Sequence, residues 1–129
     1  MNLPFDLASE PYINLATFRK NGHEVRTPVW VASAGDTHYV FSEARAGKVK
    51  RIRNNGRINI AACDARGGVK STWISGTARI VTDEAEIETM YRVFDQKYGW
   101  QMRLLNFTAR LSGRYRKRAI IAFQTESSD

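Results

Sequence analysis

The pattern of apolar and polar positions, with turn residues between segments, predicts six β-strands in this chain. In the first strand Ile13, Leu15 and Thr17 share one face, and the residues between them occupy the other. Asn21-Gly22 follows, a pair that favours a tight hairpin because both residues tolerate positive φ. The expected strands cover residues 12–18, 23–32, 37–42, 57–64, 69–82 and 118–125.

Apolar residues at helical spacing predict a helix that starts at Asp83. Asp83 and Glu86 resemble a capping box with Asp in place of Ser or Thr, and Gly99 fits the C-cap. The apolar positions of this helix are Ile87, Met90, Tyr91, Phe94 and Tyr98. A shorter helix is expected over residues 100–111.

A further helix, rich in cations, is expected over residues 43–54, with Ser42 as its N-cap. The basic residues in and just after it are Arg45, Lys48, Lys50, Arg51, Arg53 and Arg57. Two interpretations stay open. The charges either face water, or the helix N-terminus binds an anion through its free N–H groups, the Ser42 hydroxyl and Lys48.

These elements predict a mainly β fold with added helices (β+α). Short links between strands favour an antiparallel sheet, and six strands with two or three helices suit a small barrel with helices across its openings. At 129 residues the chain has the size of one domain, which we take as residues 1–129.

The net charge is concentrated and bears on the choice of partner. It is +7, from 20 Lys and Arg against 13 Asp and Glu. A second basic cluster comprises Arg110, Arg114, Arg116, Lys117 and Arg118. Clustered cations attract phosphates, nucleic acids or acidic tails. A basic nucleic-acid-binding module can rest on phosphate contacts alone, but the aromatic residues here are not interleaved with the arginines. Nucleic acid is therefore the less favoured partner.

The sequence shows no set of side chains that would catalyse a reaction without a cofactor. Cys63 lies in an apolar run and is expected to be a buried small hydrophobe. The two histidines, His23 and His38, have no metal-ligand spacing, so we predict no metal site. No nucleophile elbow, GxGxxG or Walker loop is present. If the protein is an enzyme, a cofactor supplies the difficult step, and no catalytic residue can be assigned.

Targeting features are also lacking. The N-terminal residues do not have the pattern of a signal peptide, and no apolar stretch is long enough to cross a bilayer. We expect a cytoplasmic protein without a membrane partner.

Two short motifs allow more than one interpretation. Pro28 cannot donate to a strand ladder, so the strand around it has an edge, a bulge or a ligand at that point. Trp30 then belongs to the core, to a subunit contact or to a platform for a flat ring. In the motif KYGW, Tyr98 completes the helix stripe, and Trp100 packs internally, covers a pocket mouth or meets another subunit.

Longer stretches carry a resemblance to a known family. They are YINLATFRKNGHEVRTPVW, YVFSEARAGKVKRIRNNGRINIAACDARG, WISGTARIV and KYGW, in order along nearly the whole chain. The chain resembles the pyridoxamine 5′-phosphate oxidase-like, FMN-binding split-barrel superfamily. Within it, the chain is similar to the actinobacterial PPOX-class F420-dependent oxidoreductases. The resemblance implies a six-stranded antiparallel split barrel that forms a homodimer, with cofactor sites at the subunit interface.

The resemblance also implies which residues bind the cofactor. The flavin or deazaflavin ring would lie along the strand that contains Arg26, Thr27, Pro28, Val29 and Trp30. Phe41 and Ser42 would meet the ribityl-phosphate portion, with Ser42 in a place where Thr is common. Lys48 would bind phosphate, and its neighbours Val49, Lys50 and Arg51 would lie beside a longer tail.

The activity implied is hydride transfer from reduced F420 to a small-molecule acceptor such as a quinone, enone or tetrapyrrole. FMN on the same fold is the alternative cofactor, and a cofactor carrier with little turnover is another alternative. The acidic polyglutamate tail of F420 fits the net charge of +7. A pyridoxal 5′-phosphate function is less favoured, because that activity normally has a longer chain with additional basic substrate contacts near its end.

Overall fold

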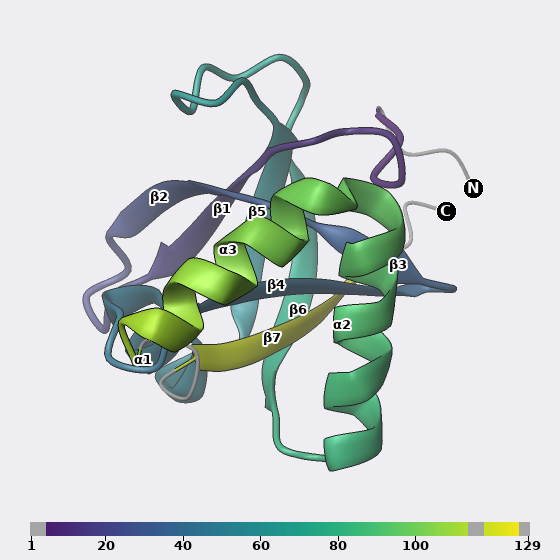
Figure 1. Ribbon diagram of the computed structural model, residues 1–129. Coiled ribbons are helices and arrows are strands. Elements are labelled where there is room, and N and C mark those ends of the chain that lie inside the picture. Colours follow the sequence, from purple (N-terminus) through teal and green to yellow (C-terminus); the bar gives the residue numbers. More distant parts are fainter. Residues whose placement is uncertain (1–4, 114–117, 127–129) are drawn as a thin grey trace.

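The computed structural model describes residues 5–113 and 118–126, which form a curled antiparallel sheet with helices against it (Figure 1). The strands are β1 (Ile13–Phe18), β2 (Glu24–Val29), β3 (Ala32–Ala34), β4 (Thr37–Glu43), β5 (Arg57–Ala62), β6 (Ile74–Val81) and β7 (Arg118–Thr125). The helices are α1 (Gly47–Asn54), α2 (Glu84–Tyr98) and α3 (Trp100–Leu111). The mainly β class with helices, of split-barrel type, is confirmed.

The strand order explains why the sheet curls. The order is β2-β1-β5-β6-β7-β4-β3, so β2 and β3 occupy opposite ends of the sheet. Only Trp30 and Val31 connect these two strands. A connection of this length spans about 10 Å, so the two ends of the sheet must lie near each other. The sheet therefore closes into a partial barrel.

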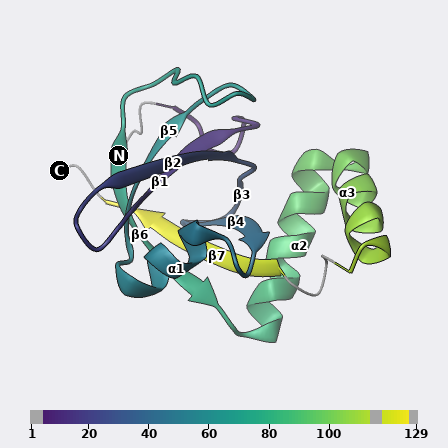
Figure 2. The same ribbon diagram turned by 90° about the vertical axis from the view of Figure 1, so that its left-hand side faces the viewer.

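Both faces of the barrel wall are buried where helices cover it. Along β7, Ile121 and Phe123 face the barrel interior, whereas Ile120 and Ala122 pack in a second cluster with α2. This alternation is the period-two geometry of a strand. Figure 2 shows α2 and α3 side by side on one flank of the sheet, with α3 outermost, and α1 below the strands.

None of the helices described is long and apolar enough to cross a membrane.

The strand count and two element boundaries differ from the sequence prediction. The expected strand over residues 23–32 is interrupted at Trp30 and Val31, so the described residues form seven strands instead of six. The strand predicted over 69–82 is shorter, Ile74–Val81, and residue 69 contributes only an isolated bridge to Cys63. In the first hairpin only Gly22 takes positive φ, at 87°.

The start of the basic helix is also different. Ser42 and Glu43 continue β4, where they pair with Ala119 and Arg118 of β7. Strand pairing therefore extends past the predicted cap, and α1 begins only at Gly47, with Ala46 at the N-cap and no side-chain cap bond. The prediction of Ser42 as N-cap was wrong.

The cap of α2 is confirmed in part. Asp83 accepts a hydrogen bond from the backbone N–H of Glu86 at 3.0 Å, and Gly99 ends the helix with φ of 58°. The Glu86 carboxylate does not complete a capping box. It accepts hydrogen bonds from Arg79 and from the Tyr39 hydroxyl instead, which ties the start of α2 to β6 and β4.

Candidate functional site

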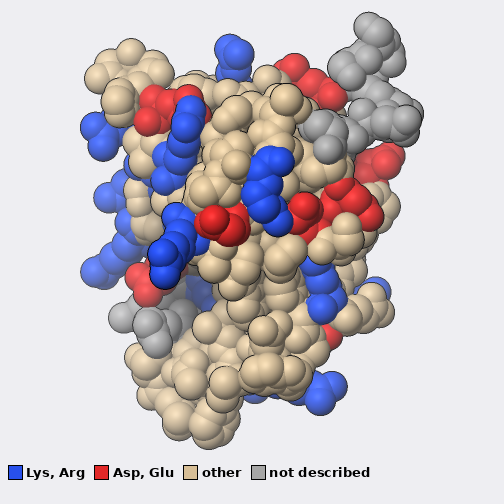
Figure 3. Space-filling view, turned by 90° about the horizontal axis from the view of Figure 1, so that it is seen from above, with Lys and Arg blue, Asp and Glu red and all other residues tan. Residues whose placement is uncertain are grey.

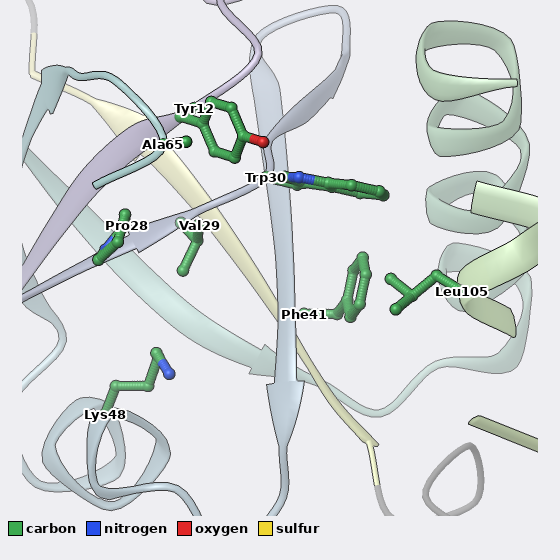
Figure 4. Close-up of a pocket in the computed structure, with 8 residues that line it drawn as sticks. All are labelled: Tyr12, Pro28, Val29, Trp30, Phe41, Lys48, Ala65 and Leu105. Carbon is green, nitrogen blue, oxygen red and sulfur yellow. The ribbon is translucent and has the colours of Figure 1, made fainter. Parts of the chain in front are cut away.

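A pocket of about 370 Å³ opens where the ends of β2 and β4 face α1 and α3 (Figure 4). Its size lies within the range of small-molecule sites. The residues that line it are Tyr12, Pro28, Val29, Trp30, Phe41, Lys48, Ala65 and Leu105. Five of the predicted site residues are thus brought together: Pro28, Val29, Trp30, Phe41 and Lys48.

One end of the pocket is cationic. Lys48 projects from α1 toward Val29 (Figure 4), and its Nζ donates a hydrogen bond to the Ser42 hydroxyl at 3.1 Å. Burial and then the neighbouring Arg51 lower the pKa of Lys48, while Glu43 opposes this shift. Within residues 5–113 and 118–126 no carboxylate forms an ion pair with Lys48. The ammonium therefore keeps hydrogen-bonding capacity for an anion in the pocket.

The other end of the pocket is aromatic and is backed by α2. The indole of Trp30 stacks on Tyr98, with ring centroids 4.3 Å apart and planes 6° apart. The Phe41 ring meets Phe94 edge-on at 5.1 Å. Such pairs hold aromatic side chains in defined orientations. They give the pocket a firm apolar wall against which a flat ring can lie.

Thr27, another of the predicted site residues, is not among the residues that line the pocket. The Thr27 Oγ1 is buried and unpaired among the described residues. It lies on the same face of β2 as Val29, which faces the barrel interior. A buried hydroxyl without a partner costs about 1–3 kcal/mol. Because protein atoms cover this hydroxyl, a ligand in the pocket does not reach it, and the predicted role of Thr27 in cofactor binding stays a prediction.

The remaining predicted residues do not present their side chains to the pocket. Arg26 is exposed, pairs with Glu24 at 2.9 Å and lies over the Trp73 ring. Val49 is fully buried in the barrel core. Lys50 is exposed on α1.

Arg51 is also directed elsewhere, because its Nε donates to the Thr17 hydroxyl at 2.6 Å. Ser42 lies outside the lining but orients Lys48. The part of these residues in cofactor binding stays a prediction.

Three lining residues were not singled out from the sequence. Tyr12 begins the first predicted strand, and Ala65 lies in the turn after β5. Leu105 comes from α3, the helix that follows α2 in the chain. Only Tyr12 carried a signal, as an aromatic residue at a strand end, whereas an alanine in a turn and a leucine in an amphipathic helix are ordinary.

The pocket can bind a ligand but has little chemistry of its own. Among the described residues, its lining contains no carboxylate, imidazole or thiol, and Tyr12 and Lys48 are the ionisable side chains there. An aromatic wall opposite one ammonium suits a flat ring attached to an anionic group. A redox reaction here would come from a bound cofactor.

Solved structures with the same fold bind several kinds of ligand. The model aligns with the heme storage protein HutZ from Vibrio cholerae with a TM-score of 0.71 and 12% identity, covering 95% of this chain and 86% of that one. An FAD-binding protein from Mesorhizobium loti aligns with a TM-score of 0.64 and 18% identity, covering 94% and 83%. A structure described as an F420 reductase aligns with a TM-score of 0.58 and 19% identity, covering 94% and 91%. At these identities the likeness shows the fold alone.

A search among curated proteins finds no match. The family model for pyridoxamine 5′-phosphate oxidase matches residues 5–127, which is almost the entire chain. Together with the curled antiparallel sheet and its helices, this match shows that the chain belongs to the pyridoxamine 5′-phosphate oxidase family.

Proposed function

We propose that the pocket binds the deazaflavin F420 and that the protein transfers hydride from it to an organic acceptor such as a quinone, enone or tetrapyrrole. The observation that carries the proposal is the position of Lys48. Its half-buried ammonium, hydrogen-bonded to Ser42, faces a pocket walled by Trp30 and Phe41. Removing a charge from water is costly unless it is paired, and an anionic ligand would pair it.

The residues present divide the work of binding between them. Pro28, Val29 and Trp30 would hold the ring, and Lys48 with Ser42 would hold the phosphate. The cofactor, when bound, supplies the hydride chemistry. The protein would orient it, shield it from water on the barrel side and leave the open side for the acceptor.

F420 is favoured over FMN because of its longer acidic tail. An FMN phosphate needs little more than Lys48, whereas a polyglutamate tail extends beyond the pocket. We expect Lys50, an exposed cation on α1 close to Lys48 in the chain, to contact that tail. FMN remains the second candidate, and the FAD-binding and heme-storage neighbours keep a carrier role as a third.

The pocket is proposed to be completed by a second copy of the chain. On α3 four large apolar side chains are exposed: Trp100 (70%), Leu104 (55%), Phe107 (59%) and Leu111 (74%). Their spacing places them on one stripe of the helix. Figure 3 shows few charged side chains over the part of the surface that α3 forms.

The size of this stripe fits self-association. If two copies pair their stripes about a twofold axis, they bury on the order of 1,000 Å² of surface, the lower end of specific interfaces. Leu105, next to the stripe, lines the pocket. A dimer of this kind would therefore set a partner subunit close to the cofactor.

The test is a titration of the purified protein with F420, FMN and duplex DNA at two salt concentrations. Submicromolar F420 binding with much weaker FMN binding would support the proposal. Protein that is yellow as purified and retains FMN would favour the second candidate. Strong, salt-sensitive DNA binding without either cofactor would reject both. Reduced F420 with a panel of quinones and enones then tests turnover.

A further inference from the structure

Two neighbouring side chains at the end of α2 contact segments that are far apart in the sequence. The Lys97 Nζ donates hydrogen bonds to three backbone carbonyls, those of Leu7 at 2.9 Å, Glu10 at 2.7 Å and Val31 at 2.6 Å. The ammonium has three hydrogens, so these contacts use all of them. Lys97 therefore joins the N-terminal segment to the break between β2 and β3.

The Tyr98 hydroxyl makes a matching set of contacts. It accepts a hydrogen bond from the backbone N–H of Val31 at 3.0 Å and donates to the carbonyl of Pro11 at 2.7 Å. Its ring stacks on Trp30. Residues at the strand break have no ladder partners for their backbone groups, and buried backbone groups need partners. Tyr98 and Lys97 supply them to Val31.

These bonds end next to two residues of the pocket. Tyr12 follows Pro11, and Trp30 precedes Val31. Tyr12 and Trp30, two of the three aromatic lining residues, thus come from different segments, and each segment is fixed to the same turn of α2. Burial raises the pKa of Tyr98 to about 12, so its hydroxyl stays protonated and remains a donor at neutral pH.

We propose that Lys97 and Tyr98 are positioning residues of the cofactor pocket, which hold Tyr12 and Trp30 in place by tying the adjacent backbone to the end of α2. The link to cofactor affinity rests on the proposed function. The effect on Trp30 does not, because the contacts exist in the protein without cofactor. If Lys97 and Tyr98 only stabilised the fold, the accessibility of Trp30 to a quencher would rise equally in any variant that weakens the fold.

The experiment uses Trp30 as its own reporter. Trp73→Phe and Trp100→Phe leave Trp30 as the remaining tryptophan of three. Into this background we would place Tyr98→Phe, which keeps the ring and its stacking, and Lys97→Met. One control is Arg92→Met, an exposed cation on the same helix. The other is Ile121→Val, which weakens the barrel core at β7 and removes none of the hydrogen bonds of Lys97 and Tyr98.

Acrylamide quenching of Trp30 is measured without cofactor, and F420 and FMN affinities are measured alongside. We expect quenching to rise in Tyr98→Phe and Lys97→Met but not in the two controls. Cofactor affinity should fall about fivefold in Tyr98→Phe, the effect of one net hydrogen bond. Unchanged quenching in both variants, or an equal rise in Ile121→Val, would overturn the proposal. If the original protein, with all three tryptophans, binds neither cofactor, the proposed function fails, while the quenching result still decides whether these residues position Trp30.

Discussion

Replacing Lys48 by alanine removes the cation at the polar end of the pocket. A charge-assisted hydrogen bond contributes about 1.5–3 kcal/mol. Lys48 is only half-buried and its pocket is open, so solvent screening favours the lower half of this range. We expect a loss of about 10- to 30-fold in the affinity for F420 and for FMN. Lys48→Met should lose nearly as much, because it keeps an apolar chain but not the charge.

Isothermal titration calorimetry at fixed salt measures these affinities, with urea unfolding to show that each variant is folded. Arg53→Ala is the matched control, since it removes a cation from the same helix at an exposed position outside the predicted site. The control should bind as the original protein does. Equal affinity in Lys48→Ala and the original protein would refute the assignment of Lys48. So would an equal loss in Arg53→Ala, which would point to net charge alone.

Three further predictions concern the tail, the dimer and pH. Lys50→Ala should weaken F420 binding and leave FMN binding unchanged in calorimetry, and equal effects on both would exclude a tail contact at Lys50. Leu104→Glu with Phe107→Glu should convert a dimer into a monomer in sedimentation equilibrium, and an unchanged mass would exclude α3 as the interface. Burial lowers the pKa of Lys97 from 10.5 to about 8, against the opposing charges of Asp6 and Glu10. Between those two values the unfolded chain holds a proton that the folded chain has lost, so the free energy of unfolding, relative to Lys97→Met, should rise from pH 8 to pH 10.5. Urea unfolding of both proteins at several pH values measures this difference, and a flat or falling difference would contradict the lowered pKa.

The sequence was sufficient for the elements that depend on local pattern. The bounds of β7 and the helix after Asp83 follow from alternation and capping, and both are present. The resemblance also grouped five residues that line one pocket in the structure: Pro28, Val29, Trp30, Phe41 and Lys48. Residues next to one another in a motif tend to stay together when the motif spans a strand end and the helix that follows.

What could not be predicted depends on contacts between distant segments. Ser42 has the chemistry of an N-cap, but pairing between β4 and β7 keeps it in the sheet. Trp30 and Val31 continue an apolar strand pattern, yet Tyr98 bonds to Val31 and the strand is broken there. Leu105 reaches the pocket only because α3 folds back across α2. A single sequence contains no local signal for any of these three outcomes.

The most direct measurement is a crystal structure of the protein grown with F420 or FMN. We predict that the ring lies against Trp30 and Val29 and that an anionic oxygen contacts the Lys48 ammonium. A cofactor found elsewhere on the protein, or one bound in the pocket with its phosphate turned away from Lys48, would contradict the proposed site.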